Sequence, residues 1–136
     1  MAMSENNQTE SPLGARRTLA LDQAISAASA LGERGVAARL LELLGPALTA
    51  AIGNAEDTHV ARGWTEGRDC NRSLALRAAL LAAAAIAATY EAEGARAWFA
   101  STNPNLNGKS PLVFIRSATE QEEFDRVVRV AAQDAR

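Results

Sequence analysis

The chain has 136 residues, enough for one domain, and its 14 Lys and Arg against 16 Asp and Glu give a net charge of −2. Its single cysteine, Cys70, excludes an internal disulfide, and one cysteine with one histidine, His59, excludes the usual four-ligand zinc site. Hydrophobic residues make up 48% of the chain but aromatic residues only 4%, and much of the difference is alanine. Because alanine is the best helix former, we expect an all-α fold.

The first 15 residues are polar, include Pro12 and Gly14, and are predicted to form a disordered tail. From Thr18 onward, apolar residues recur at helical spacing through one helix and, after two glycines, a second. The apolar positions of these two helices are Leu21, Ile25, Ala28, Leu31, Val36, Leu40, Leu43 and Leu44. Gly45-Pro46 is predicted to end the second helix, because proline cannot continue it.

Two short helical segments follow, at residues 47–52 and 56–65, and Gly53-Asn54 joins them in a tight turn. This arrangement is typical of a helix-turn-helix, which we place at about residues 46–67. Such a motif directs some side chains to a DNA major groove and others to phosphates. The candidate DNA-binding residues are Thr58, His59, Arg62, Arg68 and Arg72.

The charge of this segment does not favour strong DNA binding. Between residues 54 and 72, three arginines stand against four acidic residues, 3 − 4 = −1, whereas a DNA-binding face is usually basic. Specific binding would need a dimer or a larger assembly, and the alternative is a three-helix scaffold that binds no DNA. Trp64, inside the second short helix, is expected to be a core anchor.

A long helix is predicted over residues 72–93, and Gly94 marks its end or a bend. Its uncharged, mostly alanine stretch Ala78–Thr89 has 12 residues, short of the roughly 20 apolar residues that a membrane span needs. The first ten residues lack the pattern of a secretory signal. We therefore expect a cytoplasmic protein with no membrane partner.

The composition changes after residue 93, so residues 16–93 and 94–136 are predicted to form two regions. The second region begins with a short segment that carries Trp98-Phe99, and a run of turn residues from Ser101 to Gly108 follows. Ser110-Pro111 is a typical helix start, with serine as the N-cap and proline at the first helical position.

The last helix is predicted to begin in a cluster of acidic residues. Thr119 and Glu122 have the spacing of a capping box, and Glu120, Glu122 and Glu123 are expected to complement the helix dipole rather than bind a cation. Elsewhere the sequence has no nucleophile motif, phosphate-binding loop or dinucleotide fingerprint. We therefore expect a protein that is not an enzyme and that holds no metal or cofactor.

The stretch AWFASTNPNLNGKSPLVFI, Ala97–Ile115, combines an aromatic pair, an Asn/Pro/Gly turn and a Ser-Pro helix start. It resembles the toxin-binding domain of the MbcA/ParS/Xre antitoxins, whose pattern is A-W-[FL]-x-x-x-N-P-x-[LF]-x-[GD]-x-[ST]-P-x-x-[LF]-[LI]. Ala50–Gly67 resembles the degenerate helix-turn-helix of the same family, although R-G-W at residues 62–64 departs from the family's R-W spacing. The resemblance covers about residues 48–131.

The resemblance implies a type II antitoxin. Family members are small all-α proteins that cover the active-site cleft of a RES-domain toxin, which consumes NAD, and that help to repress their own operon, as a homodimer or as the toxin complex. The toxin-binding residues that it implies are Trp98, Phe99, Asn103, Pro104, Leu106, Gly108, Pro111, Leu112, Ile115, Arg116, Arg126 and Arg129. For the aromatic and apolar members of this set, packing inside the C-terminal region is the alternative to direct contact with a toxin.

Two other functions remain open at this point. The first is a stand-alone helix-turn-helix transcriptional regulator, in which the C-terminal region serves only for dimerisation. The second is an adaptor that keeps the helical scaffold and binds another partner.

Overall fold

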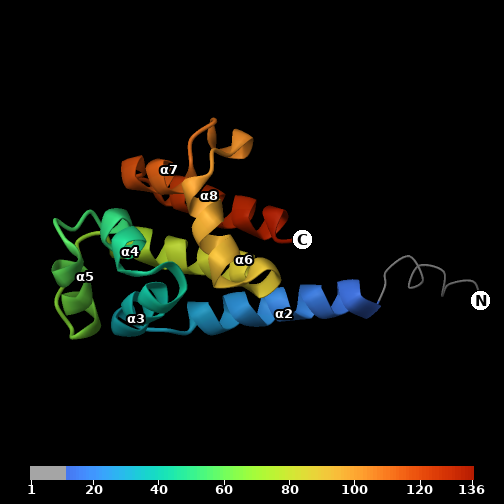
Figure 1. Ribbon diagram of the computed structural model, residues 1–136, viewed down its shortest axis with the longest axis horizontal. Coiled ribbons are helices and arrows are strands. Elements are labelled where there is room, and N and C mark those ends of the chain that lie inside the picture. Colours follow the sequence, from blue (N-terminus) through green and yellow to red (C-terminus); the bar gives the residue numbers. More distant parts are fainter. Residues whose placement is uncertain (1–11) are drawn as a thin grey trace, which may run out of the picture.

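The computed structural model describes residues 12–136, with side chains from Leu19 onward, and all regular secondary structure in this part of the chain is helical (Figure 1). The all-α prediction is confirmed. The α-helices are α2 (Pro12–Ser29), α3 (Glu33–Leu44), α4 (Pro46–Ile52), α5 (Thr58–Thr65), α6 (Ser73–Ala100), α7 (Pro111–Ser117) and α8 (Gln121–Asp134), and Pro104–Leu106 forms a 3₁₀ turn, η1.

The predicted tail, residues 1–15, lies outside the described residues up to Ser11. Helix α2 begins at Pro12 and so takes in residues 12–15, which the composition predicted as tail. Proline is tolerated there because the first turn of a helix has no intrahelical partner for its N–H groups.

The corner between α3 and α4 follows from two residues. Gly45 has a φ of +86°, a conformation that costs glycine little, and its backbone N–H donates to Leu41 O as α3 ends. Pro46 then starts α4, and the buried Thr49 donates through Oγ1 to Gly45 O at 2.8 Å. The predicted stop at Gly45-Pro46 is confirmed.

Helices α4 and α5 occupy the positions predicted for the helix-turn-helix. The Asp57 side chain caps α5 by accepting a hydrogen bond from Val60 N at 3.1 Å. The Trp64 ring is buried and packs so closely on Gly53 that a Cβ at position 53 would collide with it. Trp64 is therefore the core anchor that the sequence predicted.

Helix α6 forms the centre of the fold, and α2, α3 and α8 pack against it. Its length and apolar composition alone would allow it to cross a membrane, and half of that apolar window is buried inside the protein. Its buried residues are Ala75, Leu76, Ala78, Ala79, Leu80, Ala82, Ala83, Ala84, Ala85, Ile86, Ala95 and Phe99. Small alanine side chains let the neighbouring helices approach it closely.

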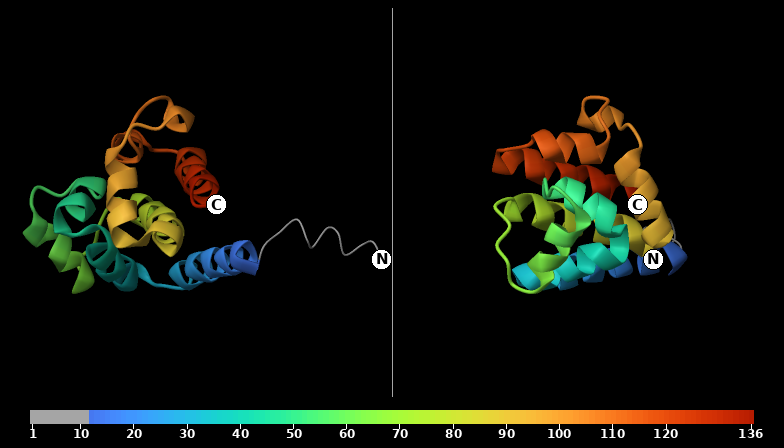
Figure 2. Two further views of the ribbon diagram at one scale, coloured as in Figure 1. Left: turned by 45° about the vertical axis from the view of Figure 1, so that its right-hand side comes forward. Right: turned by 60° about the vertical axis from the view of Figure 1, so that its left-hand side comes forward.

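Helix α6 bends sharply at Glu91, whose φ of 63° and ψ of −179° are not helical, and the second half turns towards the C-terminal helices (Figure 2). A residue with a side chain costs about 1–3 kcal/mol in such a backbone conformation. The bend therefore lies three residues before Gly94, the position that the sequence indicated. Gly94 still contributes, because a Cβ there would collide with Tyr90 Cβ.

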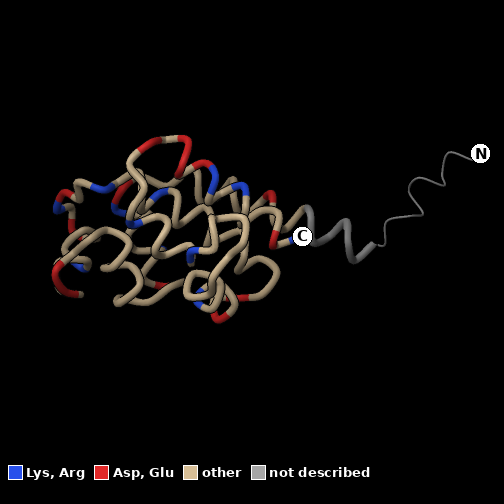
Figure 3. The backbone as a smooth tube through the Cα atoms, turned by 90° about the horizontal axis from the view of Figure 1, so that it is seen from above, with Lys and Arg blue, Asp and Glu red and all other residues tan. Residues whose placement is uncertain are grey.

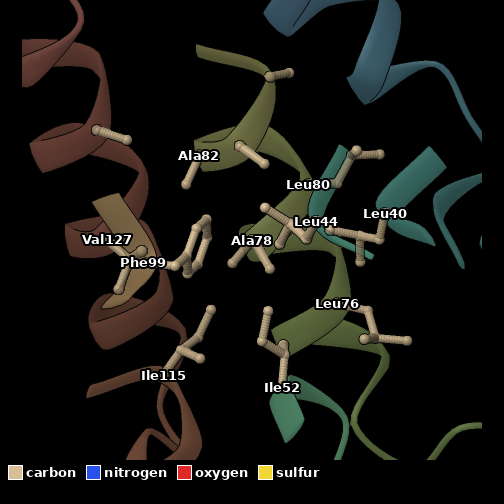
Figure 4. Packing of buried hydrophobic residues seen from close by; sticks show 14 of the residues in the cluster. Leu40, Leu44, Ile52, Leu76, Ala78, Leu80, Ala82, Phe99, Ile115 and Val127 are labelled. Atoms are coloured by element: carbon tan, nitrogen blue, oxygen red, sulfur yellow. The ribbon is translucent and has the colours of Figure 1, made fainter. Parts of the chain in front are cut away.

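A continuous core joins the two predicted regions. Figure 4 shows Phe99 between Val127 of α8 and Ala78 of the first half of α6, with Ile115 facing Ile52. Phe99, Ile115 and Val127 are fully buried. The change of composition near residue 93 thus marks a bend in α6 and not a gap between two separate cores.

The N-caps of α7 and α8 can be compared with those that the sequence predicted. Ser110 Oγ accepts from Val113 N at 3.2 Å, as predicted for the N-cap of α7. The capping box of α8, however, uses Glu120 and Glu123, one residue later than the predicted Thr119 and Glu122. The N–H groups of Thr119 and Glu120 donate to Glu123 Oε1 at 3.0 Å each and lower the pKa of this carboxyl.

Candidate partner-binding loop

Residues 101–110 form a closed loop between α6 and α7 that projects from the helical body (Figure 1). Asn103 closes it: its N–H donates to Lys109 O, and its carbonyl accepts from Gly108 N, both at 3.0 Å. Its side-chain Oδ1 also accepts from Asn105 N at 2.9 Å, which starts η1 at Pro104. Asn107 and Gly108, with φ of 61° and 75°, then reverse the chain.

Asp134, near the end of α8, fixes the base of this loop. Its Oδ2 accepts from Trp98 Nε1 at 2.8 Å and from Asn103 Nδ2 at 3.0 Å. One carboxylate thus holds both the indole that precedes the loop and the asparagine that closes it. Sequence reasoning missed this residue because 31 and 36 positions separate it from its partners. The available signal was its position, since an acidic residue in the last turn of a helix opposes the helix dipole.

Arg126 fixes the other side of the loop. Its Nη2 donates to Asn105 O at 2.9 Å and to Asn107 Oδ1 at 3.2 Å. Its guanidinium carbon lies 5.5 Å from the centroid of the Phe114 ring, within the range of a cation–π contact. The resemblance implied that Arg126 binds a toxin, but in the structure its guanidinium is used to shape the loop.

Several residues implied as toxin-binding are buried inside this chain. Phe99, Leu106, Pro111 and Ile115 are almost inaccessible to solvent, and Asn103 is only 7% exposed. Direct contact between a partner and these side chains is therefore excluded in this conformation, and they act by building the loop and its base. Trp98 is partly exposed, and its ring meets Phe99 edge to face with 5.1 Å between centroids.

The exposed residues define what a partner can touch. We call the following set the outer loop face: Pro104, Asn105, Asn107, Gly108, Lys109 and Val113. Val113 is 49% exposed on α7, and the sequence prediction did not include it. Of the other implied toxin-binding residues, Leu112 is half-buried and Arg116 and Arg129 are exposed. The Arg116 guanidinium also approaches Asn54 Oδ1 at 3.5 Å.

The candidate DNA-binding residues also divide into exposed residues and one whose side chain is used inside the fold. Thr58, His59 and Arg62 are exposed on α5, and Arg68 is exposed just after it. Arg72 is not available for a phosphate.

The Arg72 guanidinium is directed inward. Its Nη2 donates to Ile115 O at 2.7 Å and to Ala118 O at 3.4 Å, and its Nε donates to Ile52 O at 3.4 Å. Arg72 therefore caps the C-terminal ends of α4 and α7, where a positive charge is favourable. Its predicted role at DNA phosphates is therefore wrong. Without Arg72, the segment from residue 54 to 72 has only two arginines available for DNA, against four acidic residues. Figure 3 shows basic and acidic positions interspersed over the described chain.

A cleft of about 100 Å³ lies between α3, α5 and α6, lined in part by Trp64, Arg68, Cys70 and Arg77. Burial raises the pKa of the Cys70 thiol, which makes this sulfur a weaker nucleophile at neutral pH. Arg77 is committed to the backbone, donating to Leu31 O at 2.7 Å. Among the described residues, His, Cys, Asp and Glu form no group of three that could hold a metal ion.

Comparisons with protein families, with curated proteins and with solved structures each found no match. The proposals below are therefore argued from the residues of Ala97–Ile115 and from the geometry of the loop that they build.

Proposed function

We propose that this chain is the antitoxin of a type II toxin–antitoxin module of the MbcA/ParS/Xre kind. In this proposal it binds a RES-domain toxin, covers the cleft in which the toxin consumes NAD, and catalyses nothing itself. The observation that carries the proposal is how the motif is used: its residues Trp98, Asn103 and Pro104 all help to build one rigid, projecting loop.

A rigid loop suits this role physically. Its conformation is fixed in advance by Asp134, Arg126 and the hydrogen bonds of Asn103, so less conformational entropy is lost when a partner binds. The outer loop face offers apolar area at Val113 with a positive charge at Lys109, and Arg116 lies exposed on the same helix as Val113. This combination fits a concave partner with an apolar floor and an acidic rim.

We also propose that α4 and α5 contribute to repression of the operon. The support is the position of Thr58, His59 and Arg62, which lie exposed on α5, in a segment that has one more acidic than basic residue. Two copies, or the toxin complex, would place two α4–α5 segments on one DNA site, so that their individually weak contacts add. A stand-alone regulator is the alternative, and it predicts specific DNA binding by the isolated chain with a steep dependence on salt.

The test is a titration of purified RES-domain toxin with this protein, with NAD consumption as the readout. We expect inhibition that saturates at a fixed stoichiometry. Val113→Asp should weaken inhibition at least tenfold, because a charge would replace apolar area at the interface, at a cost of about 1.4 kcal/mol or more. Leu74→Asp is the matched control, since Leu74 is 52% exposed on α6 outside the loop. A toxin that keeps full activity in molar excess of this protein contradicts the proposal.

Arg62→Ala separates the two proposed activities. It should reduce operator binding, measured by a mobility shift at low salt, and leave inhibition of the toxin unchanged, because Arg62 lies on α5 and takes no part in the loop. Equal loss of both activities would contradict the division between the loop and the α4–α5 segment.

A further inference from the structure

Glu91 is the single residue inside α6 with non-helical backbone angles. Its φ of 63° combined with a ψ of −179° belongs to a region that is almost reserved for glycine. Glu91 is exposed, and its side chain takes part in none of the hydrogen bonds or ion pairs found within residues 19–136. The strain is therefore held by packing elsewhere and not by any contact of Glu91 itself.

The sequence on both sides of Glu91 favours a helix. Tyr90 ends one helical stretch and Ala92 begins the next, so a change at one residue would join them into a 28-residue helix. Such a straight α6 would extend for about 42 Å at 1.5 Å per residue. It would also carry residues 92–136 away from the residues of the same chain that they now cover.

The bent form is held by contacts across the hinge. Phe99 and Val127 pack on the alanine face of the first half of α6, as Figure 4 shows. Thr89 Oγ1 donates to Ala135 O at 2.7 Å, and Arg72 donates to Ile115 O at the same distance. Straightening α6 would break each of these contacts and expose apolar surface on both sides.

A second copy of this chain carries the same two complementary surfaces, one on residues 19–90 and one on residues 92–136. We propose that Glu91 is the hinge of a domain-swapped dimer, in which α6 straightens and residues 92–136 of each copy pack on residues 19–90 of the other. The exchange restores every contact across the hinge and removes the backbone strain at both Glu91 residues. Identical exchange in both directions closes the assembly with two-fold symmetry.

The exchanged segment contains the whole loop together with the residues that fix it. Trp98, Asn103, Arg126 and Asp134 all follow the hinge, so their mutual hydrogen bonds are the same in the monomer and in the swapped dimer. The dimer would present two intact outer loop faces and place two α4–α5 segments in one particle. The proposal does not depend on what the loop binds.

A cross-link between residues on opposite sides of the hinge distinguishes a swapped dimer from any other dimer. Thr89→Cys with Ala135→Cys, in a Cys70→Ser background, places two thiols at positions that are adjacent in the fold. The chain is refolded at high concentration, oxidised, and separated by gel filtration into monomer and dimer before non-reducing electrophoresis. We expect disulfides within one chain in the monomer fraction and between chains in the dimer fraction.

Two substitutions at Glu91 test whether backbone strain at this residue favours the swapped dimer. Glu91→Gly relieves the strain of the bent form, so the dissociation constant of the dimer should rise about tenfold or more. Glu91→Ala relieves nothing in the bent form and favours a straight helix, so this constant should stay equal or fall. Three results would overturn the proposal: no dimer after refolding at high concentration, a dimer whose disulfides all lie within single chains, or an equal change in the two variants.

Discussion

The loop at residues 101–110 and the turn between α4 and α5 are built from similar residues but are held in different ways. The loop is fixed from a distance, by Asp134 and Arg126 of α8. The α4–α5 turn is fixed locally, by the Asp57 cap and by the packing of Trp64 on Gly53. In both places the residues that make the sequence pattern recognisable mostly build the backbone shape, and other side chains remain exposed for a partner.

The largest expected effect comes from the residue that joins the two regions. Phe99→Ala removes a fully buried ring from the shared core and should destabilise the protein by about 3–5 kcal/mol. Because the core is continuous, denaturant unfolding should remain a single transition with a lower midpoint. Val113→Ala, at an exposed position, is the control and should change stability little. Two separate transitions, with the first half unaffected, would break the account of one core.

Asp134→Ala tests whether the loop depends on its distant carboxylate. The substitution leaves Trp98 Nε1 and Asn103 Nδ2 without their acceptor and should cost about 2–3 kcal/mol. Toxin binding should fall with it, while the far-ultraviolet circular dichroism stays helical. Asp125→Ala, exposed on the same helix, should do neither. Unchanged affinity for the toxin in Asp134→Ala would show that the partner does not need the ordered loop.

Gly53→Ala tests the local packing of the α4–α5 turn. The added Cβ would meet the buried Trp64 ring, and the cost should be about 1–2 kcal/mol. Gly32→Ala has open space around it and should have a much smaller effect. Thermal unfolding and DNA binding are the readouts, and inhibition of the toxin should persist. If inhibition falls in parallel with DNA binding, the two regions are not held independently.

The smallest effect is the pH dependence of the α8 cap. The folded state lowers the pKa of Glu123, so its contribution is fully present above the usual pKa of a glutamate and is lost as the pH falls through the lowered value. Glu123→Ala should therefore lower the melting temperature slightly at pH 7 and have no effect near pH 2. A difference between the two proteins that persists at pH 2 would mean that Glu123 acts through something other than its charge.

Local signals in the sequence predicted the helical elements well. Hydrophobic spacing, Gly45-Pro46 and Ser110-Pro111 depend on neighbouring residues, and the structure confirms each of them. The capping box of α8 differed by one residue because both Glu122 and Glu123 stand near the helix start. Helix α2 begins earlier than its polar composition predicts, because a proline such as Pro12 is tolerated in the first turn of a helix.

The roles that depend on tertiary contacts could not be predicted. Arg72 looks like a phosphate-binding residue until the ends of α4 and α7 are brought to it. Asp134 has no local partner, and the hinge at Glu91 carries no glycine to mark it. An apolar helix face also has the same spacing whether it packs on its own domain or on a partner, so burial and not periodicity separates core residues such as Ile115 from exposed residues such as Val113.

The most direct test of the central claim is co-expression of this chain with a RES-domain toxin in a growing cell, with growth and cellular NAD measured together. The account predicts that the intact chain restores both, that Leu74→Asp does so equally, and that Val113→Asp does so poorly at the same protein level. Depletion of NAD by the toxin despite abundant, folded, intact chain would contradict the assignment as an antitoxin.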